Sequence, residues 1–126
     1  MKNVKLLDCT LRDGGFVNDW EFGQCTIHNI FRRLDHAKLD YIEIGFIDDR
    51  RDFDRNRTIA PSTSSFDLIY KNLDVKSATV VAMIDFGTCS IEKIADCKDS
   101  FIDGIRVIFK KKDMDAALEY CRQVKD

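Results

Sequence analysis

The chain has 126 residues, of which 44% are hydrophobic and 33% are charged, and its formal net charge is −2. This balance is typical of one folded domain with a hydrophobic core, and it excludes a disordered chain. The small net charge argues against electrostatic binding to nucleic acid or to an anionic membrane surface. Because no apolar stretch has the length of a signal peptide or a membrane span, we expect a cytoplasmic protein without membrane contact.

Four stretches rich in β-branched and apolar residues alternate with helical patterns. Strands are expected at residues 4–8, 41–46, 78–84 and 104–109. Apolar residues at helical spacing predict helices around 27–34, 66–73 and 114–121, with a serine cap within 62–65, and a shorter helix near 91–95. The alternation of strands and helices predicts an α/β fold with a parallel sheet and right-handed crossovers.

Two architectures fit four consecutive βα units: an open doubly wound sheet, or half of a (β/α)8 TIM barrel. Doubly wound nucleotide-binding folds carry a glycine-rich phosphate loop after the first strand, and TLRDGGFVNDW (10–20) has neither of the usual patterns. A complete barrel needs roughly 250 residues, about twice this length. We therefore expect residues 1–126 to form the N-terminal half of a barrel and to be a fragment of a longer chain.

The five cysteines, an odd number, show no CxxC spacing and predict reduced thiols rather than a disulfide framework or a zinc site. They are Cys9, Cys25, Cys89, Cys97 and Cys121.

Charged residues stand where the first two strands end. Arg12 and Asp13 precede two glycines, Gly14 and Gly15, which would let the backbone turn sharply and approach a ligand. Glu43 lies in the second strand, where a carboxylate is unfavourable unless it is paired, so an ion pair with Arg12 is expected. The alternative is a surface turn in which Asp13 accepts local backbone hydrogen bonds.

Together, LLDCTLRDGG (6–15) and YIEIGF (41–46) resemble the DRE-TIM metallolyase family, also called the HMG-CoA-lyase-like or pyruvate carboxyltransferase domain family. The resemblance is nearest to 4-hydroxy-2-oxovalerate aldolase-type proteins. It implies that Asp13 ligates a divalent metal (Mn²⁺, Mg²⁺ or Zn²⁺) and that Arg12 stabilises an enolate oxygen. It also implies that Glu43 completes the network around Arg12, and that all three lie at the catalytic face of the barrel.

The resemblance implies a metal-dependent aldolase or lyase that cleaves or forms a C–C bond of a small 2-oxo acid. One alternative is a synthase of the same family that condenses acetyl-CoA with a 2-oxo acid, and another is a non-catalytic half-barrel module. The chain has no HxH pair for the metal, and Phe16 and Val17 occupy the region where an aldolase histidine would follow Arg12 and Asp13. We therefore expect the full-length protein to be an enzyme and the 126-residue chain alone to be inactive.

Three further features are candidates for the same face. Asp85 ends the third strand and is a candidate substrate-binding residue, or else a cap or turn residue. Arg106 in the fourth strand is expected to form an interior ion pair. Residues 48–58 hold four Asp and four Arg and exceed the usual length of a βα loop, which predicts a lid or a substrate-binding loop.

An open four-stranded sheet would leave its edge strands and one apolar face exposed. We therefore expect a homo-oligomer, or pairing with the missing C-terminal half of the barrel.

Overall fold

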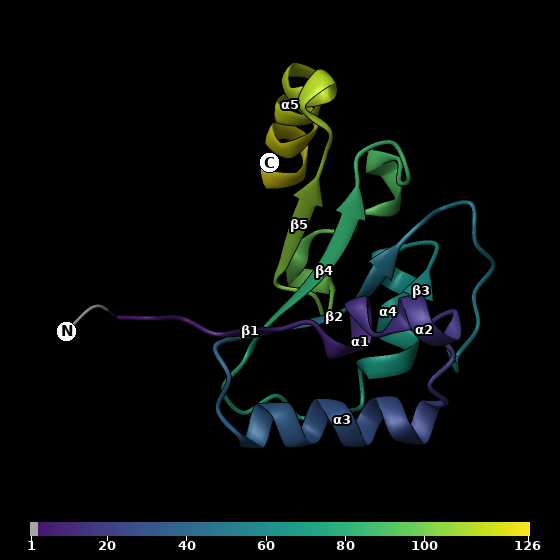
Figure 1. Ribbon diagram of the computed structural model, residues 1–126, viewed down its shortest axis with the longest axis vertical. Coiled ribbons are helices and arrows are strands. Elements are labelled where there is room, and N and C mark those ends of the chain that lie inside the picture. The colour runs from purple at the N-terminus through teal and green to yellow at the C-terminus, as the bar shows by residue number, and fades with distance from the viewer. Residues whose placement is uncertain (1–2) are drawn as a thin grey trace.

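The computed structural model describes residues 3–126, which form a mixed α/β fold around one parallel sheet (Figure 1). The strands are β1 (Leu7–Asp8), β2 (Tyr41–Ile47), β3 (Ile59–Ala60), β4 (Thr79–Asp85) and β5 (Gly104–Ile108). The main path of the sheet runs β1-β2-β4-β5 in chain order, and all of its strand pairs are parallel. The predicted α/β class and parallel sheet are confirmed.

Within these residues, five α-helices and three 3-10 turns connect the strands. The helices are α1 (Thr10–Asp13), α2 (Gly15–Asn18), α3 (Gln24–His36), α4 (Thr63–Tyr70) and α5 (Met114–Lys125). The 3-10 turns are Ile91–Lys93, Cys97–Asp99 and Lys111–Asp113. The helices predicted around 27–34, 66–73 and 114–121 are confirmed, and the Ser62 hydroxyl caps α4 by accepting the Ser65 N–H at 3.1 Å.

Side chains of β2 point alternately to the two faces of the sheet, and this separates the hydrophobic core from the candidate site. Ile42 and Ile44 of β2 are fully buried in the same hydrophobic cluster as Phe31 of α3 and Phe66 of α4. Because successive side chains of a strand point to opposite faces, Glu43 points away from this helix-covered face. The fold thus places one carboxylate on the side of the sheet that these helices leave open.

In place of the short α-helix predicted near 91–95 the chain forms a single 3-10 turn, Ile91–Lys93, and a second 3-10 turn follows at Cys97–Asp99. The apolar pattern spans little more than one helical turn, which is too short to stabilise an isolated helix. The Asp96 carboxylate also accepts the Lys98 N–H at 3.0 Å, so a side chain takes the place of a helical backbone acceptor.

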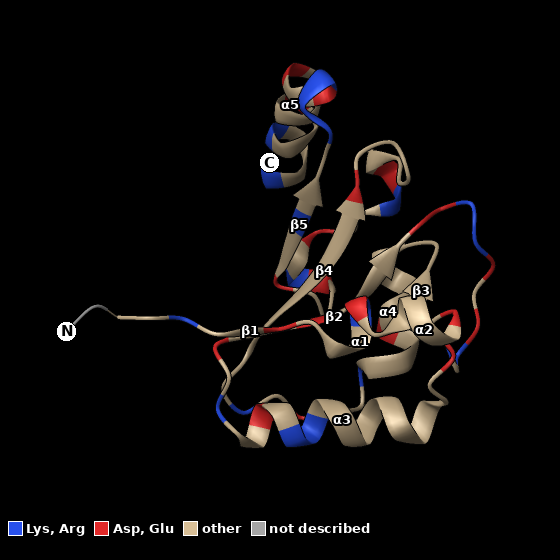
Figure 2. Cartoon of the chain, viewed as in Figure 1, with Lys and Arg blue, Asp and Glu red and all other residues tan. Residues whose placement is uncertain are grey.

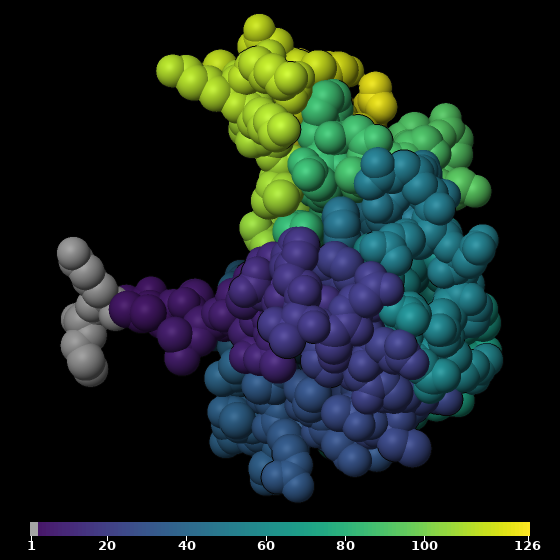
Figure 3. Space-filling model, turned by 45° about the vertical axis from the view of Figure 1, so that its right-hand side comes forward, coloured from purple at the N-terminus to yellow at the C-terminus, as the bar shows by residue number. Residues whose placement is uncertain are grey.

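The first strand is shorter than the predicted 4–8, because only Leu7 and Asp8 pair with β2. Residues 3–6 extend from the body of the molecule, with Val4 72% and Leu6 59% exposed (Figure 3). On the main path of the sheet the edges are β1 and β5, as expected for an open arrangement. Exposed apolar side chains accompany the β5 edge at Ile108, Phe109, Met114 and Leu118.

The sequence did not predict β3, which pairs with β2 through Phe46–Ile59 and Ile47–Ala60. Since β4 occupies one edge of β2, β3 lies on the same edge as β1, farther along the strand. This pairing returns the long segment 48–58 to the sheet beside the residues that follow β1.

None of the helices in residues 3–126 combines the length and apolar character needed to cross a bilayer.

Candidate functional site

Two arginines from distant parts of the chain bind one buried carboxylate. The Arg12 Nε–H, in α1, donates to Glu43 Oε1 at 2.5 Å. Arg106 of β5 donates from Nε to Oε2 at 2.6 Å and from Nη2 to Oε1 at 2.9 Å. Glu43 is fully buried although it lies on the open face of the sheet, because these guanidinium groups cover it. The ion pair predicted for Glu43 with Arg12 is confirmed, and Arg106 also forms an ion pair with the buried Glu43, although the Arg106 side chain is 39% exposed rather than interior.

The charges in this cluster stabilise each other. Burial by itself would raise the pKa of Glu43, but the hydrogen bonds and positive charges of Arg106 and Arg12 outweigh it and lower that pKa. The carboxylate in turn raises the pKa of Arg106. Glu43 is therefore ionised near neutral pH and fixes the orientation of two planar donor groups.

Asp13 lies at the edge of this cluster. Its Oδ1 accepts a hydrogen bond from Arg12 Nη1 at 2.8 Å, and its side chain is 63% exposed. In residues 3–126 no group of three or more His, Cys, Asp or Glu side chains is arranged to hold a metal ion. Asp13 thus offers one exposed carboxylate with a cationic neighbour, and the described residues do not by themselves fit a metal centre.

The two glycines serve close packing rather than a sharp turn, which corrects the role expected from the sequence. Neither has a positive φ, and both belong to the short helical turns that follow β1. A Cβ on Gly14 would lie 2.4 Å from the Thr10 carbonyl oxygen, and one on Gly15 would lie 1.8 Å from Trp20 Cδ1. Larger residues would therefore push apart the segment that carries Arg12.

Asp85 ends β4, as predicted, at the carboxyl end of the sheet. Its carbonyl oxygen accepts the Thr88 N–H at 2.9 Å and the Thr88 hydroxyl at 2.8 Å, so the backbone forms a turn there. Among the hydrogen bonds of residues 3–126, none joins the Asp85 side chain to Arg12, Glu43 or Arg106. The structure therefore places Asp85 on the expected edge but outside the Glu43 cluster.

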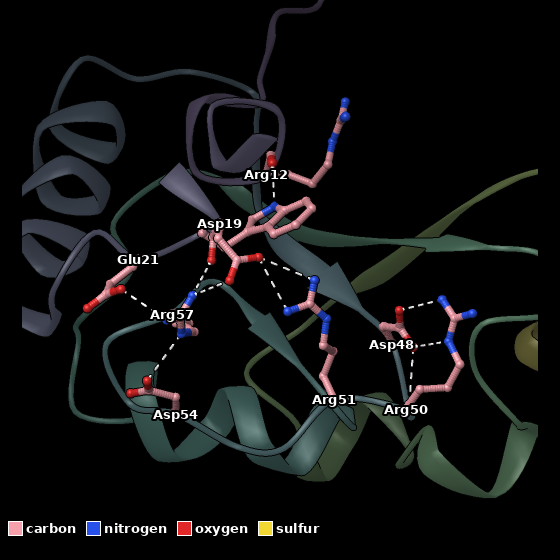
Figure 4. A network of polar contacts seen from close by, with 9 residues as sticks. Arg12, Asp19, Glu21, Asp48, Arg50, Arg51, Asp54 and Arg57 are labelled. Atoms are coloured by element: carbon pink, nitrogen blue, oxygen red, sulfur yellow. Dashed lines mark hydrogen bonds and ion pairs between the residues drawn. The ribbon is translucent and has the colours of Figure 1, made fainter. Parts of the chain in front are cut away.

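The long segment 48–58, whose acidic and basic residues are coloured in Figure 2, is bound to the turn after α2 by the contacts drawn in Figure 4. Arg57 donates to the Asp19 carbonyl oxygen at 2.6 Å, to the Asp19 carboxylate at 2.7 Å and to Glu21 at 3.0 Å. Arg57 also reaches Asp54 at 3.3 Å, and Arg51 reaches Asp19 at 3.3 Å. We call these five residues the loop network.

Trp20 and Thr58 join the loop network to the segment that carries Arg12, and sequence reasoning missed both. The Trp20 indole N–H donates to the Arg12 carbonyl oxygen at 2.8 Å. The Thr58 hydroxyl donates to the Leu11 carbonyl oxygen at 2.6 Å. The only signal in the sequence was that Trp20 is the single tryptophan, which specifies neither contact.

No protein-family model matches the chain, and no curated protein and no solved structure matches it either.

Stability is expected to fall as the solution becomes acidic. Burial alone would raise the pKa of Asp35, but hydrogen bonds from the N–H groups of Lys76, Ala78 and Ser77 lower it, and the pKa of Glu43 is lowered as well. A carboxyl group with a lowered folded-state pKa stabilises the fold above its unfolded pKa, about 4, and loses this effect as pH falls through the folded value. Urea unfolding at pH 7, 5 and 3.5 should show a decline concentrated below pH 5.

Asp35→Asn is the matched variant for this prediction. It should be less stable than the unaltered chain at pH 7, and its stability should depend less on pH. An equal decline with pH in both proteins would contradict a contribution from Asp35.

Proposed function

We propose that this chain is the N-terminal half of a barrel enzyme, an aldolase or lyase that makes or breaks a C–C bond of a small 2-oxo acid through an enolate. The observation that carries the proposal is the Arg12 guanidinium, oriented by buried Glu43 at the end of the sheet where parallel strands place their chemistry. Arg12 Nη2 forms no hydrogen bond within residues 3–126. A fixed guanidinium with a free donor suits negative charge that develops on an enolate oxygen.

The half-barrel part of the proposal is supported by strand order. A barrel places strands side by side in chain order, as β1, β2, β4 and β5 are here, whereas a doubly wound sheet reverses direction at a switch point. Four further βα units, from the rest of a longer chain or from a second copy, would pair with the open β1 and β5 edges.

The proposal includes a divalent metal (Mn²⁺, Mg²⁺ or Zn²⁺) that Asp13 would bind together with ligands from outside residues 3–126, because those residues hold no group of three or more ligating side chains. This arrangement also favours one alternative function, a half-barrel module that assembles without catalysis. In that case the Arg12–Glu43–Arg106 cluster would hold the fold together and would bind no substrate.

The test uses a protein that joins this chain to four further βα units. It is incubated with pyruvate in D₂O, with Mn²⁺, Mg²⁺ or Zn²⁺, and exchange of the methyl protons is followed by ¹H NMR. Enolate formation should give exchange above the rate without protein, while the 126-residue chain alone should give none. No exchange with any of the three ions would contradict the proposal and favour the assembly module. Adding an aldehyde or acetyl-CoA then distinguishes an aldolase from a synthase by product.

Self-association is the expected behaviour of the isolated chain. Apolar residues at both sheet edges are partly uncovered, with Leu7 of β1 43% and Ile108 of β5 36% exposed. Light scattering should give a mass of at least twice the 14.6 kDa of one chain. A well-folded species with the mass of a single chain would contradict this prediction.

A further inference from the structure

We propose that Trp20 is the positioning residue for Arg12 and that Arg51 and Arg57 hold Trp20 in place from the segment 48–58. The proposal rests on the proposed function only for the chemistry assigned to Arg12. In this proposal the segment 48–58 helps to position the Arg12 guanidinium, whereas the sequence predicted that it is a lid or a substrate-binding loop.

The backbone at Trp20 has an uncommon conformation. Asp19 and Trp20 have φ values of 52° and 58°, and two consecutive residues with side chains rarely occupy this left-handed region. Two backbone hydrogen bonds hold Trp20 in this conformation. The Trp20 N–H donates to the Gly15 carbonyl oxygen at 2.9 Å, and the Trp20 carbonyl oxygen accepts the Thr58 N–H at 3.0 Å. It brings the indole against Gly15, where no Cβ is in the way.

The indole acts on the peptide group next to the Arg12 side chain. Helix α1 has only four residues, so hydrogen bonds within it are few and its position depends on outside contacts. The Trp20 indole N–H fixes the Arg12 carbonyl oxygen at 2.8 Å, and Trp20 is 6% exposed, which shields this bond from water. The Trp20 indole therefore fixes the backbone of Arg12, while Glu43 fixes the guanidinium at the other end of the side chain.

The charged segment holds the indole and its turn from the opposite side. The Arg51 guanidinium carbon lies 5.7 Å from the centre of the Trp20 ring, within the range of a cation–π contact. Arg51 and Arg57 both bind Asp19, the first of the two left-handed residues (Figure 4). Releasing these arginines would free the turn to relax and would withdraw the indole from Arg12.

The arginine Nε–H groups give a direct test by ¹H–¹⁵N NMR. Arg12 and Arg106 both donate from Nε to Glu43, so each should give a resolved Nε–H signal that exchanges slowly with water. Trp20→Phe keeps an aromatic ring but lacks the N–H donor. In this variant the Arg12 signal should shift and exchange faster, while the Arg106 signal should keep its position and serve as an internal control.

Two variants in the charged segment complete the test. Arg51→Lys keeps the charge but lacks the planar group over the ring, and it should move the Arg12 signal in the same direction by less. Arg55→Lys, an exposed position in the same segment, should move neither signal. The amide spectrum reports whether each variant is folded, and Arg51→Lys carries the test if Trp20→Phe does not fold.

An unchanged Arg12 signal in a folded Trp20→Phe or Arg51→Lys protein would overturn the proposal. So would a joint shift of the Arg12 and Arg106 signals, which would indicate general loosening. Because no step measures turnover, the result is independent of whether the aldolase proposal holds.

Discussion

Replacing Glu43 by glutamine is expected to lower the free energy of unfolding by roughly 3–5 kcal/mol, the usual cost of removing one partner from a buried ion pair. The amide fills the same space but leaves Arg12 and Arg106 without the carboxylate between them, so that Arg12 keeps only its pair with Asp13. Arg106 is 39% exposed and can turn toward water, so a value near the lower end of this range is expected. Urea denaturation monitored by Trp20 fluorescence measures the change.

An exposed ion pair supplies the control for Glu43→Gln. Asp74 and Lys76 form a pair in which both side chains are more than 70% exposed, and Asp74→Asn should change stability much less than Glu43→Gln does. The double variant Glu43→Gln with Arg106→Gln should recover part of the loss, because it removes the arginine whose ion pair was with Glu43, while Arg12 still pairs with Asp13. Equal small losses for Glu43→Gln and Asp74→Asn would contradict the assigned role of the buried carboxylate.

For the enzyme proposed above, Arg12→Lys is expected to lower kcat about 10²–10³-fold, the usual effect of removing one donor from a site that stabilises an oxyanion. Lysine keeps the positive charge but lacks the planar guanidinium. It therefore does not donate hydrogen bonds to Glu43, Asp13 and a substrate oxygen in fixed directions at the same time. KM should change less than kcat, because the lost interaction strengthens as the enolate forms. Steady-state kinetics with the 2-oxo acid measure both.

The matched control for this variant is Arg122→Lys on α5, where the arginine pairs with Glu119 and is 72% exposed. It should leave kcat unchanged. A kcat for Arg12→Lys within twofold of the unaltered enzyme would remove Arg12 from the catalytic site and would favour a purely structural cluster.

Sequence reasoning was strongest where one physical rule left few choices. A carboxylate inside a strand needs a cation, and the position of Arg12 just after the first strand made it the expected partner of Glu43. The repeated apolar spacing of α3 and α4 and the serine cap at Ser62 were equally local signals, and the structure confirms them.

The remaining parts of the site depend on contacts that leave no periodic signal. The two-residue strand β3 is too short to be recognised, yet it brings Thr58 beside Leu11. The role of Gly15 depends on the Trp20 ring, and its sequence context suggested a turn instead. These positions are set by single side chains that meet backbone groups across 40 or more residues or across an irregular turn, which neither propensity nor spacing encodes.

The separation of Arg106 from Glu43 along the chain has a consequence for synthesis. These two residues are 63 positions apart, whereas Arg12 precedes Glu43 by 31. At a translation rate of about 5–20 residues per second, Glu43 leaves the ribosome roughly 3–13 seconds before its second arginine. During that interval the nascent chain holds a carboxylate with only one of its two cations. The second guanidinium completes the cluster only when β5 joins the sheet, so a strand that emerges after β1, β2 and β4 is needed to close the site.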